Sequence, residues 1–384
     1  MTMTYSWKKA LLALCAGVTM LVSSCAKKFS GDDPLPVTYD PSVIISSKNQ
    51  FVYAFDPKTG KKHWELNLGT PIVASPALRD TLLYVGGLNG TLYKIDAKRG
   101  KLLKTIAFPN ASIVATPVVW ENLVLVGTTN DTLYAIKEDE GIKCTFDAGD
   151  QIVASPATSN GKVILVSVNG RMFKMNAIDG IYDWTYDAGA GTEFHTSPVI
   201  SGQYIFAGNK DGKMYSVRFA DGTLKWTYQT TSVDGNTYGI FSSPIIYGGS
   251  VIFGADDSRL YCVDTSTGLH RWAEPFKTGD RIRSSPYAHQ NIVYVGSYDY
   301  NLYAINILNG QKVWSYLTHG LIKSSPLVYD GFVYTASYDQ YFYALDIVTG
   351  KPRWVQFLGG EIESSPMVDD LTGKSFHSAI SGVN

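Results

Sequence analysis

Histidine, cysteine and acidic residues are the groups in this chain that could hold a metal ion or act as nucleophiles. The six histidines lie far apart and show no H-x-H or H-x-x-x-H spacing. A metal site needs several donors at short spacing, or a fold that gathers them. We therefore expect structural or surface roles for His63, His195, His270, His289, His319 and His377. The sequence predicts no catalytic, metal-binding or cofactor-binding residue.

Acidic and amide side chains follow a repeating pattern. Asp211 and Asp257 could suggest calcium loops, but an Asp or Asn recurs eight times, each time four residues before an aromatic residue. The pairs are Asn49/Tyr53, Asn89/Tyr93, Asn130/Tyr134, Asn169/Phe173, Asp211/Tyr215, Asp257/Tyr261, Asp299/Tyr303 and Asp339/Tyr343. Asp and Asn favour turns because their side chains bond the nearby backbone. We interpret these residues as the turns of a repeat.

A Ser-Pro or Thr-Pro pair recurs in register with these turns. In one copy Ser284–Pro286 begins a strand, Ile292–Val295 and Leu302–Ile305 form a hairpin around a Gly-Ser-x-Asp turn, and Gln311–Tyr316 forms a fourth strand. The pairs end at Pro76, Pro117, Pro156, Pro198, Pro244, Pro286, Pro326 and Pro366. A period of about 40 to 45 residues with several short strands per unit is typical of propeller blades.

These elements predict an all-β fold, an eight-bladed β-propeller of four-stranded antiparallel blades. The chain begins in the middle of a unit, with Val43–Ser46 and Phe51–Phe55, and ends in the middle of one, with Ser364–Val368. We expect these fragments to share one blade and close the ring, which removes an open sheet edge. Phe376–Ile380 competes with Val43–Ser46 for the second strand of that blade, and the sequence leaves this choice open.

The turn before the last strand of a unit carries a further motif. Ala54-x-Asp56-x-x-Thr59-Gly60-x-x-x-Trp64 resembles the tryptophan-docking motif of the pyrroloquinoline-quinone-type repeat. The resemblance implies that each indole packs between neighbouring blades, which buries about 150–250 Å² per indole. We expect this blade-docking role for Trp64, Trp184, Trp226, Trp272, Trp314 and Trp354. Lys104 and Thr145 stand in its place in the second and third copies, where we expect weaker contacts.

The first 24 residues predict a signal peptide. Lys8-Lys9 precede the apolar stretch Ala10–Val22, which is too short to span a bilayer. Val22-Ser-Ser-Cys25 resembles a bacterial lipobox, which implies that Cys25 is lipidated and tethers the protein to a membrane. Secretory cleavage beside an incidental cysteine is the alternative. If Cys25 is lipidated, residues 25–41 form the lipidated cysteine and a flexible tether, and residues 42–384 form the propeller.

The residue second after Cys25 bears on the destination of such a lipoprotein. Lys27 is not the aspartate that retains many lipoproteins at the inner membrane. The resemblance therefore implies the outer membrane, on its periplasmic side or at the cell surface.

Composition excludes some partners and some chemistry. The net charge is −1, and Lys and Arg form no clustered run beyond Lys8-Lys9 and Lys27-Lys28, so we expect no nucleic-acid binding. Cys144 and Cys262 fall in blades too far apart for a disulfide, and we expect both to act as small buried hydrophobes.

The repeat leaves scaffold and enzyme to be distinguished. Quinone-dependent dehydrogenases share this repeat, but the resemblance to them would imply a longer chain with large inserted loops and an adjacent cysteine pair. This sequence has no such pair. A compact, lipid-anchored propeller of this repeat instead resembles the BamB-type lipoproteins of the outer-membrane β-barrel assembly machinery. That resemblance implies a non-catalytic scaffold for protein partners. A quinoprotein-like enzyme and a glycan- or peptide-binding propeller are the alternatives.

Two asymmetries predict where a partner would dock. The segment from Gln229 to Ile240 is the longest connection between blades and contains Tyr238. We expect it to protrude on the face that carries the Asn and Asp turns; a tolerated insertion is the alternative. The residues two positions before each Ser or Thr of the Ser/Thr-Pro pairs are Val73, Val114, Val153, His195, Phe241, Arg283, Lys323 and Glu363. Equivalent positions in a closed ring lie at similar depth, so we expect a channel mouth that is half apolar and half charged. Tyr238, Phe241, Arg283 and Lys323 are the candidate partner-binding residues, with packing between blades as the alternative for the apolar arc.

Overall fold

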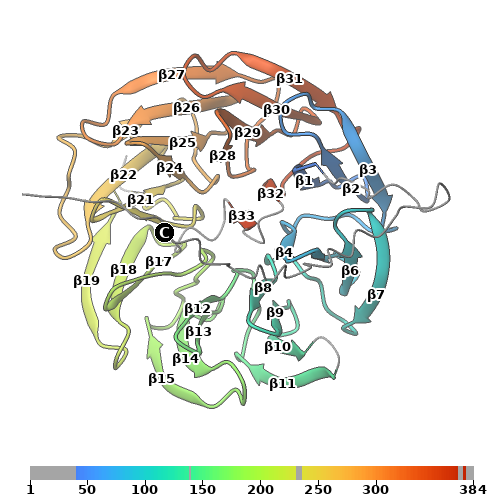
Figure 1. Cartoon of the computed structure of the whole chain (residues 1–384). Coiled ribbons are helices and arrows are strands. Elements are labelled where there is room, and N and C mark those ends of the chain that lie inside the picture. The colour runs from blue at the N-terminus through green and yellow to red at the C-terminus, as the bar shows by residue number, and fades with distance from the viewer. Residues whose placement is uncertain (1–39, 138–139, 231–235, 371–374, 378–384) are drawn as a thin grey trace, which may run out of the picture. The chain divides into compact units, whose positions relative to one another are not determined.

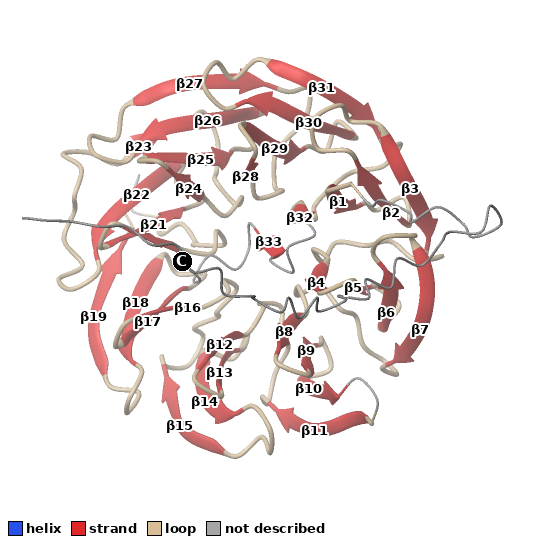
Figure 2. Ribbon diagram, in the orientation of Figure 1, coloured by secondary structure: helices blue, strands red, loops and turns tan. Residues whose placement is uncertain are grey.

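The computed structural model describes residues 40–137, 140–230, 236–370 and 375–377, so the predicted signal peptide, Cys25 and residues 26–39 of the predicted tether lie outside them. The described residues form eight antiparallel sheets arranged as the blades of a ring (Figure 1). All of the regular structure in this part of the chain is β-strand (Figure 2). The predicted all-β, eight-bladed propeller is confirmed.

Each blade is a meander that runs from the channel to the rim. Blade 1 holds β1 (Ser42–Ser46), β2 (Phe51–Phe55), β3 (Lys62–Asn67), β32 (Met367–Asp369) and β33 (Ser375–His377). Blade 2 is β4 (Ala77–Arg79), β5 (Leu82–Gly86), β6 (Thr91–Asp96) and β7 (Lys101–Ala107); blade 3 is β8 (Val118–Trp120), β9 (Leu123–Gly127), β10 (Thr132–Lys137) and β11 (Gly141–Asp147). Blade 4 is β12 (Ala157–Ser159), β13 (Lys162–Val166), β14 (Arg171–Asn176) and β15 (Tyr182–Asp187); blade 5 is β16 (Val199–Ser201), β17 (Tyr204–Gly208), β18 (Lys213–Arg218) and β19 (Leu224–Gln229). Blade 6 is β20 (Ile245–Tyr247), β21 (Ser250–Gly254), β22 (Arg259–Asp264) and β23 (Phe276–Lys277); blade 7 is β24 (Tyr287–His289), β25 (Ile292–Gly296), β26 (Asn301–Asn306) and β27 (Lys312–Leu317); blade 8 is β28 (Leu327–Tyr329), β29 (Phe332–Ala336), β30 (Tyr341–Asp346) and β31 (Pro352–Phe357).

The core lies between the blades. The second and third strands of a blade are buried on both faces, as in β25 and β26, because each blade packs against two neighbours. The fourth strand alternates exposed and half-buried residues, as in β27. The three-residue inner strand follows the repeated proline, which suits an edge that faces the channel because proline donates no ladder hydrogen bond.

The two ends of the chain complete blade 1 together. The strand order is β3-β2-β1-β32-β33, with Ile44 opposite Met367, and Figure 1 shows the blue N-terminal strands beside the red β32. The Ser364 hydroxyl joins them further, since it donates to the Ser46 carbonyl at 2.6 Å and accepts from the Ser46 amide at 3.0 Å. Val43–Ser46 therefore supplies the second strand, and β33 pairs with the channel edge of β32, which answers the question the sequence left open.

The tryptophans dock between blades as the resemblance implied. Each indole Nε1 donates to a backbone carbonyl of the next blade: Trp64 to Ala97, Trp184 to Phe219, Trp226 to Thr265, Trp272 to Ile307, Trp314 to Ile347 and Trp354 to Pro57, at 2.6–3.2 Å. A glycine of that next blade lies against the ring. At Gly350 a Cβ would stand 2.6 Å from the Trp314 ring, and its φ of +68° also favours glycine.

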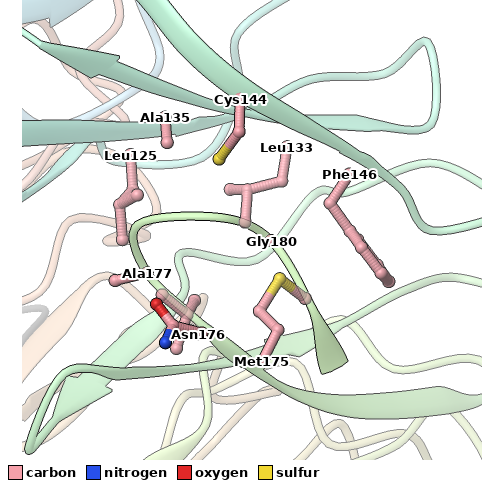
Figure 3. A pocket seen from close by; sticks show the side chains of 10 residues that line it. Leu125, Leu133, Ala135, Cys144, Phe146, Met175, Asn176, Ala177 and Gly180 are labelled. Atoms are coloured by element: carbon pink, nitrogen blue, oxygen red, sulfur yellow. The ribbon is translucent and has the colours of Figure 1, made fainter. Parts of the chain in front are cut away.

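One expected position was wrong. In the third blade Cys144, not Thr145, pairs with Ala135 and so occupies the place of the indole. Cys144 is nine positions after Ala135, whereas Trp354 is ten positions after Ala344, so the turn is one residue shorter than the repeat assumes. Figure 3 shows Cys144 beside Leu133 at a small apolar cavity whose lining includes Gly180, the glycine against which an indole would rest. In the second blade Lys104 holds the position as expected, opposite Lys94.

Candidate docking face at the channel mouth

The ring of eight side chains predicted from the Ser/Thr-Pro pairs lines a single cavity. Its volume is about 420 Å³, and Val73, Val114, Val153, His195, Phe241, Arg283, Lys323 and Glu363 all contribute to its wall. We call this end of the channel the mouth. Equivalent residues meet here because each loop that enters an inner strand is held in the same way in all eight blades.

Backbone hydrogen bonds set that common position. The residue before each repeated Asn or Asp donates its amide to a carbonyl of the neighbouring loop, as Asp256 does to Gly239 and Tyr298 does to Arg281, at 2.9 and 3.0 Å. The other pairs are Lys48 to Glu361, Leu88 to Pro71, Thr129 to Ser112, Val168 to Gln151, Lys210 to Glu193 and Tyr338 to Leu321. The turns are thereby fixed to the loops of the mouth.

A belt of hydroxyl groups that was not predicted from the sequence lies two residues further along each loop. The Ser or Thr of each Ser/Thr-Pro pair lines the same cavity, and a backbone amide of one blade donates to the hydroxyl of the next. Among the described residues, seven such bonds of 2.8–3.0 Å run from Thr116 through Ser155, Ser197, Ser243, Ser285, Ser325 and Ser365 to Ser75. The signal was present, since a hydroxyl residue precedes proline in all eight copies.

The apolar arc belongs to the cavity and not to the packing between blades. Val73, Val114 and Val153 are half-buried and line the mouth. The isoleucine one position earlier in each loop is fully buried, as at Ile72 and Ile113. In each of these loops the isoleucine therefore fills the core and the following valine reaches the cavity. The valines do not serve to pack neighbouring blades together, which was the alternative for this arc.

Phe241 lies where the apolar and charged arcs meet. Its ring is 5.1 Å from the His195 ring and 4.3 Å from the guanidinium carbon of Arg283. A cation over an aromatic face is attracted by about 0.5–1 kcal/mol at an exposed site and by more when water is excluded. The aromatic ring is thus held between two polar neighbours and open to the cavity.

The charged arc is internally paired. Arg283 binds Asp256 with two hydrogen bonds of 3.0 and 2.7 Å. The Glu363 carboxylate accepts from Lys323, from Lys48 and from the Tyr338 hydroxyl. Burial alone would raise the pKa of Glu363, but these three partners outweigh it and lower the pKa to about 2. The carboxylate is therefore ionised at any physiological pH and balances the cations around it.

Tyr238 occupies a different place from the other candidate residues. Its carbonyl accepts from the Thr230 hydroxyl at 3.2 Å and lies next to Gly212 in the turn of blade 5, so the segment is on the mouth face as expected. However, Tyr238 is not among the described residues that line the cavity. The prediction that its loop protrudes concerns residues 231–235, which lie outside the described residues.

The mouth does not suit a planar tricarboxylate cofactor such as pyrroloquinoline quinone. Arg283 and Lys323 already bind carboxylates, and Glu363 itself faces the cavity. An added tricarboxylate would have to break these pairs and lie beside a carboxylate of the same sign. Among the described residues no group of three His, Cys, Asp or Glu side chains could hold a metal ion. Cys144 and Cys262, in blades 3 and 6, are both free thiols.

Comparison with known proteins places the chain in a family. The family model described as outer membrane protein assembly factor BamB matches residues 48–144, 112–316 and 277–372. No curated protein matches the sequence. In the part of the chain that the structure describes, no apolar helix reaches the length needed to cross a bilayer.

Solved structures share the fold at low identity. BamB from Moraxella catarrhalis is 19% identical with a TM-score of 0.65, and the match covers 79% of this chain and 89% of that one. The computationally designed Ika8 protein is 17% identical with a TM-score of 0.67, covering 80% and 96%. A quinohemoprotein alcohol dehydrogenase from Pseudomonas putida HK5 is 16% identical with a TM-score of 0.66, covering 79% and 70%. These likenesses show the propeller fold, and the match of the family model over most of the propeller shows that the chain belongs to the family of outer membrane protein assembly factor BamB.

Proposed function

We propose that the protein is a non-catalytic, lipid-anchored scaffold of the cell envelope and that the channel mouth docks a protein partner. The main support is the wall of the mouth, where an arc of three valines, followed by His195 and Phe241, faces a paired charged arc. A polypeptide offers apolar and polar groups together, so it can use both halves. An aromatic residue next to arginine at the centre of a concave surface is also typical of binding hot spots.

The family supports the setting of this function. Its description refers to outer-membrane protein assembly, so the proposed partner is a component of the β-barrel assembly machinery. The lipobox at Val22–Cys25 would tether the propeller to the outer membrane. Several acyl chains would hold it there, because each buried CH₂ stabilises attachment by about 0.8 kcal/mol.

The chemistry of the mouth supports a scaffold over an enzyme. Its cations are engaged by Asp256, Glu361 and Glu363, and its hydroxyls bond backbone amides of neighbouring blades. A nucleophilic hydroxyl needs a base that takes its proton. The belt hydroxyls such as Ser325 instead accept structural hydrogen bonds.

In-cell photo-crosslinking tests the proposal. A photoreactive amino acid at Phe241 or Tyr238 should capture an outer-membrane assembly protein, identified by mass spectrometry. Leu308 is the matched control, because it is exposed on the turn between β26 and β27 at the opposite end of blade 7. Equal capture from Leu308 and Phe241 would contradict docking at the mouth.

Two further assays distinguish the alternatives. Dye-linked oxidation of alcohols or sugars after addition of quinone and calcium would favour a quinoprotein enzyme. This alternative is tested because a quinohemoprotein alcohol dehydrogenase shares the propeller fold. Binding on a glycan array would favour a carbohydrate receptor. Neither activity is expected if the mouth is a protein-docking site.

A further inference from the structure

The contacts that join neighbouring blades are unequal around the ring. We call the contact between two neighbouring blades a seam. Six of the eight seams hold an indole whose Nε1 donates to the next blade. Lys104 and Cys144 take its place in blades 2 and 3, so the seams between blades 2 and 3 and between blades 3 and 4 lack it. Each of these two seams therefore lacks a buried aromatic surface and a hydrogen bond.

The hydroxyl belt is interrupted at one of these two seams. Between blades 3 and 4 the Thr116 amide donates to the Ser155 hydroxyl at 3.0 Å. Between blades 2 and 3 the corresponding bond, from the Ser75 amide to the Thr116 hydroxyl, is absent from the described residues. Thr116 is the one threonine among the eight belt residues, and β-branching restricts the directions in which its hydroxyl can point. The gap in the belt thus coincides with a missing indole.

A second row of hydroxyl groups lies on the other side of the ring. The residue before each belt residue carries a hydroxyl in the loops that enter blades 5, 6, 7, 8 and 1, and it is alanine in the loops that enter blades 2, 3 and 4. Ser242 and Ser284 use this hydroxyl to donate to a carbonyl of the next blade, at Ser284 and Ser324, over 2.9 and 3.1 Å. Ala74, Ala115 and Ala154 can make no such bond.

The apolar core of the seam between blades 2 and 3 is the smallest in the part of the chain that the structure describes. It consists of seven buried residues, Tyr84, Leu92, Phe108, Ile113, Val124, Val126 and Ile136. The core between blades 3 and 4, where the indole is also missing, has twelve, and the core between blades 8 and 1 has thirteen. Less apolar surface is therefore removed from water between blades 2 and 3 than at the other seams.

Lys104 lies beside the space that an indole would fill. It lines a small apolar pocket between blades 2 and 3 together with Ile106, Val124 and Ile136. A lysine can extend its charged end into water, whereas an indole between two blades is held on both sides. This position therefore joins the two blades less firmly than tryptophan does elsewhere.

The loop between blades 2 and 3 still connects them at the mouth. The Ser112 hydroxyl donates to the Leu88 carbonyl of blade 2 at 2.7 Å, and the Ser112 amide donates to the Thr129 hydroxyl of blade 3 at 2.8 Å. The rings of Phe108 and Tyr134 also meet across the seam, 4.3 Å apart. The seam is thus closed in the structure, with its loop placed as a hinge.

We propose that the seam between blades 2 and 3 is the joint of the ring, the place where the propeller opens before it opens anywhere else. The missing indole, the gap in the belt, the alanines and the smallest core coincide only here. The apolar arc of the mouth spans this joint, because Val73 precedes blade 2 and Val114 precedes blade 3. Opening changes the spacing of these valines, while the charged arc lies on the firmly joined blades 7, 8 and 1. The joint belongs to the protein alone and does not depend on the proposed docking.

Hydrogen exchange of the full chain, followed by mass spectrometry in urea below the unfolding transition, tests the joint. A blade at an opened seam loses one of its two neighbours, so its strands fray and their amides exchange. We expect β5 and β9, in the blades on either side of the joint, to exchange about tenfold faster than the equivalent strands β21 and β25, since the joint lacks a hydrogen bond and an indole. Equal exchange in all blades would overturn the proposal. So would fastest exchange in β1 and β2, where the two ends of the chain meet.

Exchanging the belt residues of a weak and a strong seam provides matched variants. Thr116→Ser gives the joint the residue of the other seven positions and should slow exchange of β5 and β9 about fivefold by allowing the missing bond. Ser285→Thr makes the opposite change between blades 6 and 7 and should speed exchange of β21 and β25. Lys104→Trp offers an indole to the pocket and should also slow β5 and β9. If neither Thr116→Ser nor Lys104→Trp slows these strands in protein with an unchanged circular dichroism spectrum, the missing contacts do not set the opening and the proposal fails.

Discussion

Replacing Glu363 by glutamine removes the charge at which three parts of the ring meet. Its carboxylate binds Lys48 from the N-terminal part of blade 1, Lys323 from the loop before blade 8, and the Tyr338 hydroxyl. The side chain is only 12% exposed. Glutamine has the same shape but carries no charge, so Lys323 loses its carboxylate partner and Lys48 keeps only Glu361. We therefore expect the variant to lose stability.

The lowered pKa sets the magnitude of this loss. Lowering the pKa from 4.5 to about 2 corresponds to roughly 3 kcal/mol of stability at neutral pH. Solvent at the mouth screens part of this interaction, so we expect about 1–2 kcal/mol for Glu363→Gln. Because the folded state lowers the pKa, the contribution is fully present above pH 4.5 and disappears as the pH falls towards 2.

Urea unfolding as a function of pH measures the effect. Glu361→Gln is the matched control, because Glu361 lies two residues away in the same loop, pairs with Lys48 at 2.9 Å and is 48% exposed. We expect it to cost less than about 0.5 kcal/mol. Equal stability of the two variants at neutral pH, or a loss of stability in Glu363→Gln that persists unchanged in acid, would contradict this role of the Glu363 charge.

Three other outcomes follow from the structure. Phe241→Ala together with Tyr238→Ala should reduce partner capture while changing the melting temperature by less than about 2 °C, because both side chains are partly exposed; a parallel loss of capture and stability would contradict docking. Gly350→Ala should destabilise by about 2–4 kcal/mol through contact with an indole, whereas Gly331→Ala, with φ +80° and open space around it, should cost about 1 kcal/mol in chemical unfolding. Cys262 is buried, and burial raises the pKa of its thiol, so it should react with a thiol reagent only when the protein unfolds. Reaction in the native state would contradict the burial of Cys262.

The sequence predicts the fold and the ring of the mouth because the ring is closed and repetitive. The fixed spacing of the turn Asn or Asp and the prolines places equivalent residues at equal depth, and Val114 and Phe241 line one cavity as expected. The repeat failed where its length changed, since a turn shorter by one residue brought Cys144 into the indole position.

The paired charges could not be predicted in the same way. Lys48 and Glu361 are 313 residues apart, and Arg283 and Asp256 lie on different blades. Their contact depends on which loop and which turn become neighbours after closure. The hydroxyl residues of the belt can be recognised in the sequence, because each precedes a repeated proline. Their role cannot, because each hydroxyl accepts a hydrogen bond from the backbone amide of another blade, as Ser325 does. Tyr238 lay on the expected face yet outside the cavity, since a long loop carries no repeat to fix its side chains.

The first and last segments of the chain interlock to close one ring with one mouth. Zero-length carbodiimide crosslinking of the native protein can detect this closure, because Lys48 Nζ lies 2.9 Å from the Glu361 carboxylate and also contacts Glu363. We expect a peptide in which Lys48 is joined to Glu361 or Glu363, alongside the local Lys62–Glu65 crosslink that serves as a positive control. A strong Lys62–Glu65 product without any crosslink from Lys48 to Glu361 or Glu363 would contradict the closure.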